Sequence, residues 1–124
     1  MKVVALDYGS ARTGVAVSDP TGTVARPVAI VDRAATDDGF DKLLAVIAAE
    51  EPEVIVVGMP LTLRGEHGEQ AGETAAFVER LRAATSARVD TYDERFTSVL
   101  AGGDDARAAA HLLSGYLEWQ SRRS

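Results

Sequence analysis

Apolar residues in the first third of the chain predict three strands. Residues 3–6 form a continuous apolar run, which is typical of a strand buried on both faces. Within residues 12–18, Thr13, Val15 and Val17 alternate with the smaller Gly14, Ala16 and Ser18. Since the turn between the two runs is short, this alternation predicts a hairpin with the first strand. Residues 24–31 follow another turn and predict a third strand.

The rest of the chain predicts helices that alternate with strands. Thr36 is placed to cap a helix whose apolar residues recur at helical spacing through residue 47. Residues 54–57 predict a buried strand, residues 62–72 a polar loop, and residues 75–81 a second helix. Residues 88–92 predict a fifth strand. Asp104 is expected to cap a last helix that continues through Trp119, with a frayed tail after it.

This order of elements predicts an α/β domain over residues 1–124. The opening hairpins favour antiparallel pairing among the first three strands. Strands separated by helical crossovers favour parallel pairing in the remainder. The expected architecture is a mixed five-stranded sheet, three antiparallel strands and then parallel strands, with helices on both faces.

Acidic residues stand at the ends of the predicted strands. Asp7 ends the first strand, and Asp93 and Glu94 end the fifth. In α/β sheets, ligand sites gather beyond the carboxyl ends of the strands. Asp105 lies in the first turn of the last helix, on the face that carries Ala109 and other small or apolar residues. That face is expected to pack on the sheet, so Asp105 would point toward the strand ends.

Three carboxylates from Asp7, Glu94 and Asp105 would repel one another unless a cation joined them. Their oxygen donors favour Mg²⁺ or Mn²⁺, and two such ions can clamp the reacting oxygens of a phosphodiester. Each acid also has a simpler interpretation. Asp7 can form a turn, Asp105 can complement a helix dipole, and Glu94 can pair with Arg95. Only the combination favours a metal site.

Composition narrows the classes of function. The chain has 124 residues, no cysteine, two histidines and a net charge of −6. Disulfides and thiolate metal sites are therefore excluded, and a zinc site is disfavoured. No apolar run is long enough for a membrane span, and the start has no export signal, so a cytoplasmic location is expected. Any contact with nucleic acid must use a local basic patch or a bridging cation.

Four motifs resemble those of the YqgF/RuvX family of pre-16S rRNA nucleases, also called Holliday-junction-resolvase-like proteins. They are LDYGSARTGVAVSD (6–19), VVGMPLTLRGEHGEQA (56–71), DERFTS (93–98) and DARAAAHLLSGYL (105–117). The resemblance spans nearly the whole chain, in order and in register. It implies an RNase H-like fold and a metal-dependent nuclease acting on RNA, including pre-16S rRNA, or on branched DNA. A monomer and a homodimer both remain open.

The resemblance also assigns residues to roles. The family's acids fall on Asp7, Glu94 and Asp105, the three acids chosen above from their positions. Its basic positions fall on Arg12 and Arg95, and Ser98 stands in a Thr-Thr-like pair. Together with Arg64 in the polar loop, these residues are expected to contact nucleic acid.

One departure and two other classes of function follow from the sequence. The family usually has a longer, often basic segment before the last helix, whereas here only residues 96–104 remain. This lack of a basic loop weakens the expected grip on phosphates and keeps open a non-catalytic factor that binds rRNA or the transcription machinery. DYGSARTG also resembles the phosphate hairpin of sugar-kinase-like ATPases, but those enzymes need two domains to enclose a nucleotide.

Overall fold

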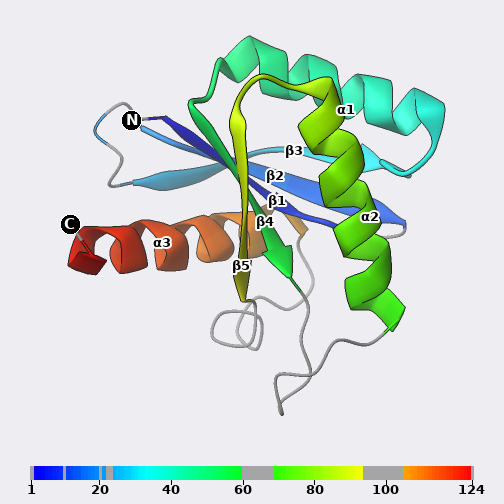
Figure 1. Cartoon of the computed structure of the whole chain (residues 1–124). Coiled ribbons are helices and arrows are strands. Elements are labelled where there is room, and N and C mark those ends of the chain that lie inside the picture. The colour runs from blue at the N-terminus through cyan, green and yellow to red at the C-terminus, as the bar shows by residue number, and fades with distance from the viewer. Residues whose placement is uncertain are drawn as a thin grey trace.

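The computed structural model describes residues 2–9, 11–19, 21, 24–59, 69–93 and 105–123. These residues form five strands and three helices in the order β-β-β-α-β-α-β-α (Figure 1). The strands are β1 (Val3–Asp7), β2 (Arg12–Ser18), β3 (Ala25–Asp32), β4 (Val54–Met59) and β5 (Arg88–Asp93). The helices are α1 (Asp37–Glu50), α2 (Glu69–Ala84) and α3 (Asp105–Arg123).

The five strands form one mixed sheet in the order β3-β2-β1-β4-β5. β1 pairs antiparallel with β2, which pairs antiparallel with β3. On its other side β1 pairs parallel with β4, which pairs parallel with β5. The mixed five-stranded sheet expected from the sequence is therefore confirmed. It brings the carboxyl ends of β1, β4 and β5 to one edge.

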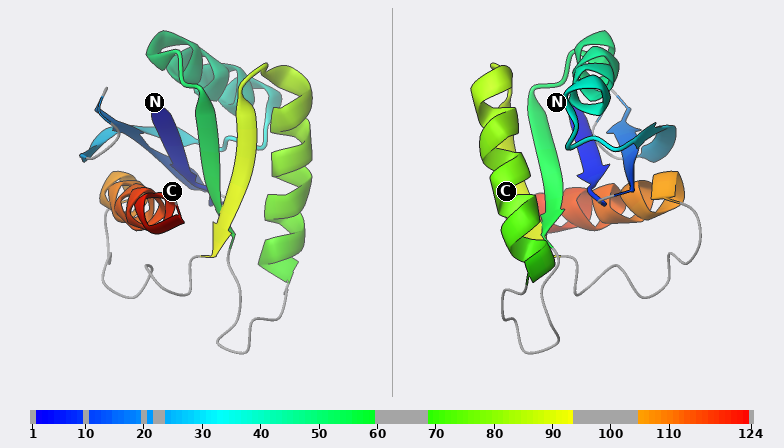
Figure 2. Two further views of the ribbon diagram at one scale, coloured as in Figure 1. Left: turned by 60° about the vertical axis from the view of Figure 1, so that its left-hand side comes forward. Right: turned by 90° about the vertical axis from the view of Figure 1, so that its right-hand side faces the viewer.

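Helices cover both faces of this sheet, and the alternation of the strands decides which residues face which helix. Val4 and Leu6 belong to the buried cluster beneath α1 and α2, whereas Val3 and Ala5 belong to the cluster beneath α3. Figure 2 shows α3 on one side of the sheet and α2 on the other. Because β1 and β4 are buried on both faces, their sequences are continuous apolar runs.

Helix α1 begins where the sequence indicates. The Thr36 side chain accepts a hydrogen bond of 3.1 Å from the Gly39 amide, and Asp37 and Asp38 lie in the first turn. These acids favour the positive end of the helix dipole. The helix ends at Glu51, whose φ of 49° is left-handed and whose amide bonds back to the last turn.

Two expected boundaries are wrong. Helix α2 begins at Glu69, so residues 69–72 are helical although a loop was expected as far as residue 72. The polar start of α2 obscured it, because helical periodicity becomes visible only at the buried Thr74, Phe77, Val78 and Leu81. Helix α3 continues to Arg123 instead of fraying after Trp119. The expected cap at Asp104 lies outside the described residues.

Candidate functional site

Asp7 occupies the end of the central strand. It is the last residue of β1, and its Cα is the partner of Gly14 in β2. Strand alternation places it on the face of Val3 and Ala5, beneath α3. Its side chain is half-buried and already makes a polar interaction within the protein. A carboxylate desolvated in this way needs such a partner or a cation.

The neighbouring strands leave room beside Asp7. The register Leu6–Val57–Thr91 across β1, β4 and β5 puts Asp7 level with Gly58 and Tyr92. Two strand spacings separate β1 from β5, or about 10 Å. Because Gly58 has no side chain, β4 places none between Asp7 and β5 at this level.

Helix α3 begins with Asp105 and packs on this same face. Ala109, Leu112 and Tyr116 are buried against the sheet, as the helical spacing predicted. The structure describes the backbone of Asp105 but not its side chain. The packing stripe therefore starts one turn after this acid.

The turn between β1 and β2 brings Arg12 to the same edge. A Cβ at Gly9 would lie 2.5 Å from the carbonyl oxygen of Arg12, so only glycine fits this close approach. Arg12 is the first residue of β2 and is exposed. By strand alternation it lies on the same face of the sheet as Gly14, which is the Cα partner of Asp7. Arg12 and Asp7 therefore lie on the same face of the sheet, on either side of the β1–β2 turn. Arg12 also has an interaction of its own within the protein.

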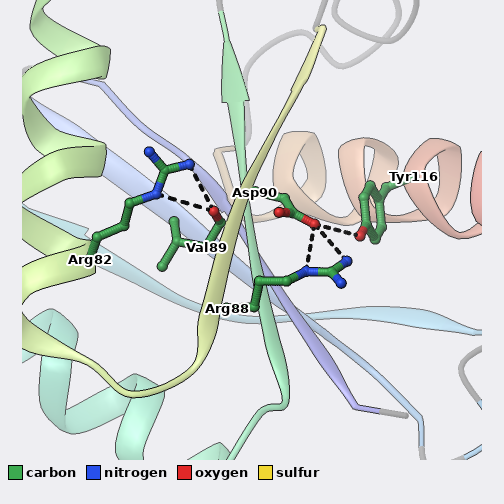
Figure 3. A network of polar contacts seen from close by, with 5 residues as sticks. All are labelled: Arg82, Arg88, Val89, Asp90 and Tyr116. Carbon is green, nitrogen blue, oxygen red and sulfur yellow. Dashed lines mark hydrogen bonds and ion pairs between the residues drawn. The ribbon is translucent and has the colours of Figure 1, made fainter.

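A polar network ties β5 to the neighbouring helices (Figure 3). The Arg88 guanidinium donates to Asp90 Oδ2 at 3.0 and 2.8 Å, and the Tyr116 hydroxyl lies 3.4 Å from the same oxygen. From the other side, Arg82 donates to the Val89 carbonyl at 3.3 and 3.0 Å. Sequence reasoning missed Asp90, although its place between Arg88 and Tyr92 in the alternation marks it as facing α3.

An aromatic cluster strengthens the contact between β5 and α3. The Tyr92 ring meets Tyr116 edge to face at a centroid distance of 5.9 Å, and Trp119 lies 6.0 Å from Tyr92. Such pairs add to the energy of burial. Tyr116 and Trp119 also contact each other, at a centroid distance of 6.1 Å. Their partner Tyr92 stands next to the end of β5, so the cluster holds the second half of α3 against the strand that leads to position 94.

The opposite face of the hairpin carries Tyr8. Its ring stacks on Phe77 of α2 at a centroid distance of 4.3 Å and an angle of 23°. Burial, and to a lesser degree the nearby carboxylate of Glu73, raises the pKa of the Tyr8 hydroxyl above its ordinary value. Tyr8 therefore packs against α2, whereas Asp7, the residue before it, faces α3 on the other side of the sheet.

Four of the seven site residues expected from the sequence lie outside the described residues: Arg64, Glu94, Arg95 and Ser98. Asp7, Asp105 and Arg12 lie within them, on the elements just described. Within the described ranges, no three acidic, histidine or cysteine side chains gather closely enough to hold a metal. The structure does not describe the side chains of Glu94 and Asp105, so the metal site stays a prediction. No helix in the same ranges is long and apolar enough to cross a membrane.

The fold is RNase H-like and resembles that of Holliday junction resolvases. The structure of Thermus thermophilus RuvC in complex with a Holliday junction matches with a TM-score of 0.67 at 15% identity, over 98% of this chain and 96% of RuvC. The resolvase of fowlpox virus matches with a TM-score of 0.60 at 13% identity, over 97% and 99% of the two chains. Identities this low establish the fold alone.

The chain belongs to the RuvX family. The family model described as "RuvX: Holliday junction resolvase" matches residues 1–110. A protein of Rhodococcus erythropolis is 38% identical over 140 aligned positions, covering 96% of this chain and 78% of the relative. One of Chlorobium chlorochromatii is 39% identical, covering 96% of both chains. Both are named "Putative pre-16S rRNA nuclease".

The alignment with the Rhodococcus protein is longer than this chain. The 140 positions aligned with the Rhodococcus protein exceed the 124 residues of this chain. The relative therefore carries residues inside the matched region for which this chain has no counterpart. The missing segment before α3 stays a prediction.

Proposed function

We propose that the chain is a divalent-metal-dependent endonuclease that hydrolyses phosphodiester bonds in structured RNA, including the 5′ end of pre-16S rRNA, in the cytoplasm. One observation carries the proposal. In a member of the RuvX family, Asp7 ends the central strand on the face covered by α3, and α3 begins at Asp105. The family's named nuclease activity and the placement of these acids support the same conclusion.

The proposed metal ligands are Asp7, Glu94 and Asp105. Asp90 and Tyr92 face α3, and the next position in this alternation is Glu94, which the structure does not describe. All donors are carboxylate oxygens, which suit Mg²⁺ or Mn²⁺. When bound, the metal would supply an activated water and stabilise charge on the leaving oxygen.

The remaining roles fall to the chain's own side chains. The three carboxylates hold the cations and thereby relieve their mutual repulsion. Arg12 lies on the same sheet face as Asp7 and is suited to bind a phosphate next to the one that is cut. Arg64, Arg95 and Ser98 are proposed to complete the contacts with nucleic acid.

The test is cleavage of a labelled precursor rRNA fragment with Mg²⁺ or Mn²⁺. Asp7→Asn keeps the shape of the side chain but removes the charge that holds the cation, so cleavage should be lost. Asp41→Asn, an exposed change on α1, is the matched control and should keep full activity. Equal cleavage by Asp7→Asn and the unchanged protein would show that the activity comes from a contaminant.

A four-way DNA junction is the second substrate to test, because the family model is described as a Holliday junction resolvase. Preferential cutting of the junction over RNA would assign the chain to resolvases. A non-catalytic role is favoured by the net charge of −6. It predicts RNA binding that survives both Asp7→Asn and a chelator, with no cleavage by any variant.

A further inference from the structure

A groove of about 730 Å³ runs between the β1–β2 turn and the start of α1. Three elements of the fold contribute to it: the turn that leads into β2, the end of β3, and the first turns of α1. Its lining comprises Ala11, Arg12, Asp32, Arg33, Thr36, Asp38, Gly39 and Lys42.

Backbone contacts fix the walls of this groove. The Arg33 amide donates to the Ala11 carbonyl at 2.9 Å, which joins the β3–α1 turn to the β1–β2 turn. The Arg33 carbonyl accepts from the Thr36 hydroxyl at 2.7 Å, and Arg33 itself holds a left-handed φ of 48°. A Cβ at Gly39 would clash with the carbonyls of Arg33 and Asp32. Helix α1 can therefore approach the backbone of these two residues this closely only because position 39 is glycine. The groove is thus built into the fold.

The charges of the groove differ from those of the whole chain. Arg12, Arg33 and Lys42 outnumber the two acids, Asp32 and Asp38, although the chain carries a net charge of −6. Arg33 and Lys42 are exposed, and neither side chain makes an ion pair with the residues that the structure describes. Cations left without partners in an acidic protein are available to an anion.

A third acid nearby is turned away from the groove. Asp37 pairs with the Arg80 guanidinium at 2.9 Å, and Arg80 also donates to the Ala35 carbonyl at 2.8 Å. The Arg80 guanidinium lies 4.1 Å from the centre of the Phe40 ring, which helps to hold it in place. Only Asp32 and Asp38 therefore oppose the cations inside the groove.

The groove opens beside the candidate site. Arg12 lines it and is the Cα partner of Asp32, while Asp7 is the partner of Gly14, two residues further along β2. One strand spacing and two residues of strand separate Asp7 from Arg12, or about 8 Å between their Cα atoms. Arg12 thus brings one end of the groove close to Asp7 at the same end of the sheet, whereas the α1 wall of the groove lies on the sheet face opposite to the one that Asp7 occupies.

We propose that this groove binds the phosphate backbone of the nucleic-acid substrate to one side of the bond that is cut, through Arg33 and Lys42. The proposal rests on the proposed nuclease function. It adds cations to the contacts already proposed, because residues 96–104 before α3 carry no basic residue. Asp32 and Asp38 limit the groove to about one or two phosphates, since each carboxylate repels the backbone.

The test measures binding of a labelled RNA stem-loop with a single-stranded 5′ extension, in the Asp7→Asn background so that the RNA stays intact. Arg33→Ala/Lys42→Ala is compared with Lys2→Ala/Arg26→Ala, which removes the same charge. Lys2 lies at the other end of β1, and Arg26 lies near the other end of β3. Both double variants should fold. In the control variant, Lys2 makes one surface ion pair and Arg26 is exposed, and in the groove variant Arg33 and Lys42 are both exposed.

The groove variant should bind about tenfold more weakly, at about threefold for each lost surface cation. Its slope of log K against log salt should become shallower by about 1.4 to 1.8, for two lost phosphate contacts. The control should stay within about twofold of the background protein. Asp38→Asn should strengthen binding, which loss of structure cannot do.

Two failures are distinguishable. If the unchanged protein cleaves RNA while the groove variant binds like the charge-matched control, the groove proposal is wrong and the nuclease proposal stands. If the unchanged protein neither binds nor cleaves the RNA, both proposals are wrong. A uniform weakening in both double variants, with no gain from Asp38→Asn, also overturns the groove, because it reflects net charge alone.

Discussion

Truncating Leu112 to alanine tests whether α3 holds the candidate site together. Leu112 is 1% exposed and packs with Val3 and Ala5 beneath the helix. Removing its isobutyl group loses transfer free energy and leaves a cavity, at a cost of about 3 kcal/mol. With an unfolding entropy of about 2.1 cal/mol/K for each residue, that loss lowers the Tm of a 124-residue chain by about 11 °C.

Leu81→Ala is the matched control on the opposite face. Leu81 of α2 is fully buried against the sheet, so its truncation should cost a similar free energy. Urea unfolding can be followed through Trp119, the chain's only tryptophan, whose ring lies 6.1 Å from Tyr116. The slope against urea should be unchanged in both variants, because each exposes the same surface on unfolding.

The two variants should differ in activity. At a temperature where both remain folded, Leu112→Ala should reduce metal-dependent cleavage, because a shifted α3 displaces Asp105 from Asp7. Leu81→Ala should keep most of its activity. A stability loss below about 1 kcal/mol for Leu112→Ala would show that α3 does not pack as described. Equal activity of the two variants would refute the link between α3 and the site.

Four further predictions concern the β1–β2 turn, α2 and the β5–α3 contact. Gly9→Ala should lower the unfolding free energy by about 2 kcal/mol, because its Cβ would lie 2.5 Å from the Arg12 carbonyl oxygen. Gly72→Ala, which meets nothing within 4 Å in α2, should raise it by about 0.5 kcal/mol, and urea unfolding measures both. Since burial raises the pKa of Tyr8, the folded state keeps its proton longer than the unfolded state, and stability should fall as pH rises above 10.0. Urea titrations between about pH 9 and 11 should show a smaller fall for Tyr8→Phe. Tyr116→Phe should cost less than about 1 kcal/mol, since its hydroxyl bond is 3.4 Å long, whereas Tyr116→Ala should cost about 3–5 kcal/mol.

The sequence predicted the sheet well because its strands have physical signatures that do not depend on tertiary contacts. A strand buried on both faces must be apolar throughout, as residues 3–6 and 54–57 are. Thr36 and the acids after it mark a helix start through a local hydrogen bond. The start of α2 was missed because its first turn is polar and carries Gly72, so neither burial nor propensity marked it.

The candidate site was only partly predictable. Asp7 was recognised because an acid after a buried strand is costly without a partner. The groove beside it was not foreseen, because Arg33 and Lys42 lie nine residues apart and meet only through the β3–α1 turn. The left-handed Arg33 and the close approach at Gly39 create that turn, and neither has a distinctive sequence pattern.

The contacts between β5 and α3 bear on whether the expected metal site depends on the length of the connection before α3. Tyr92, Tyr116 and Trp119 pack together, and Asp90 joins Arg88 to the Tyr116 hydroxyl. All of these contacts lie outside residues 94–104. The spacing between the end of β5 and the body of α3 is therefore fixed by the packing of the described elements and not by the length of the connection. A shorter connection can therefore remove phosphate contacts without moving the strand and helix that carry the acids. For this reason we expect the groove at Arg33 and Lys42, more than the metal ligands, to determine how tightly this chain binds its substrate.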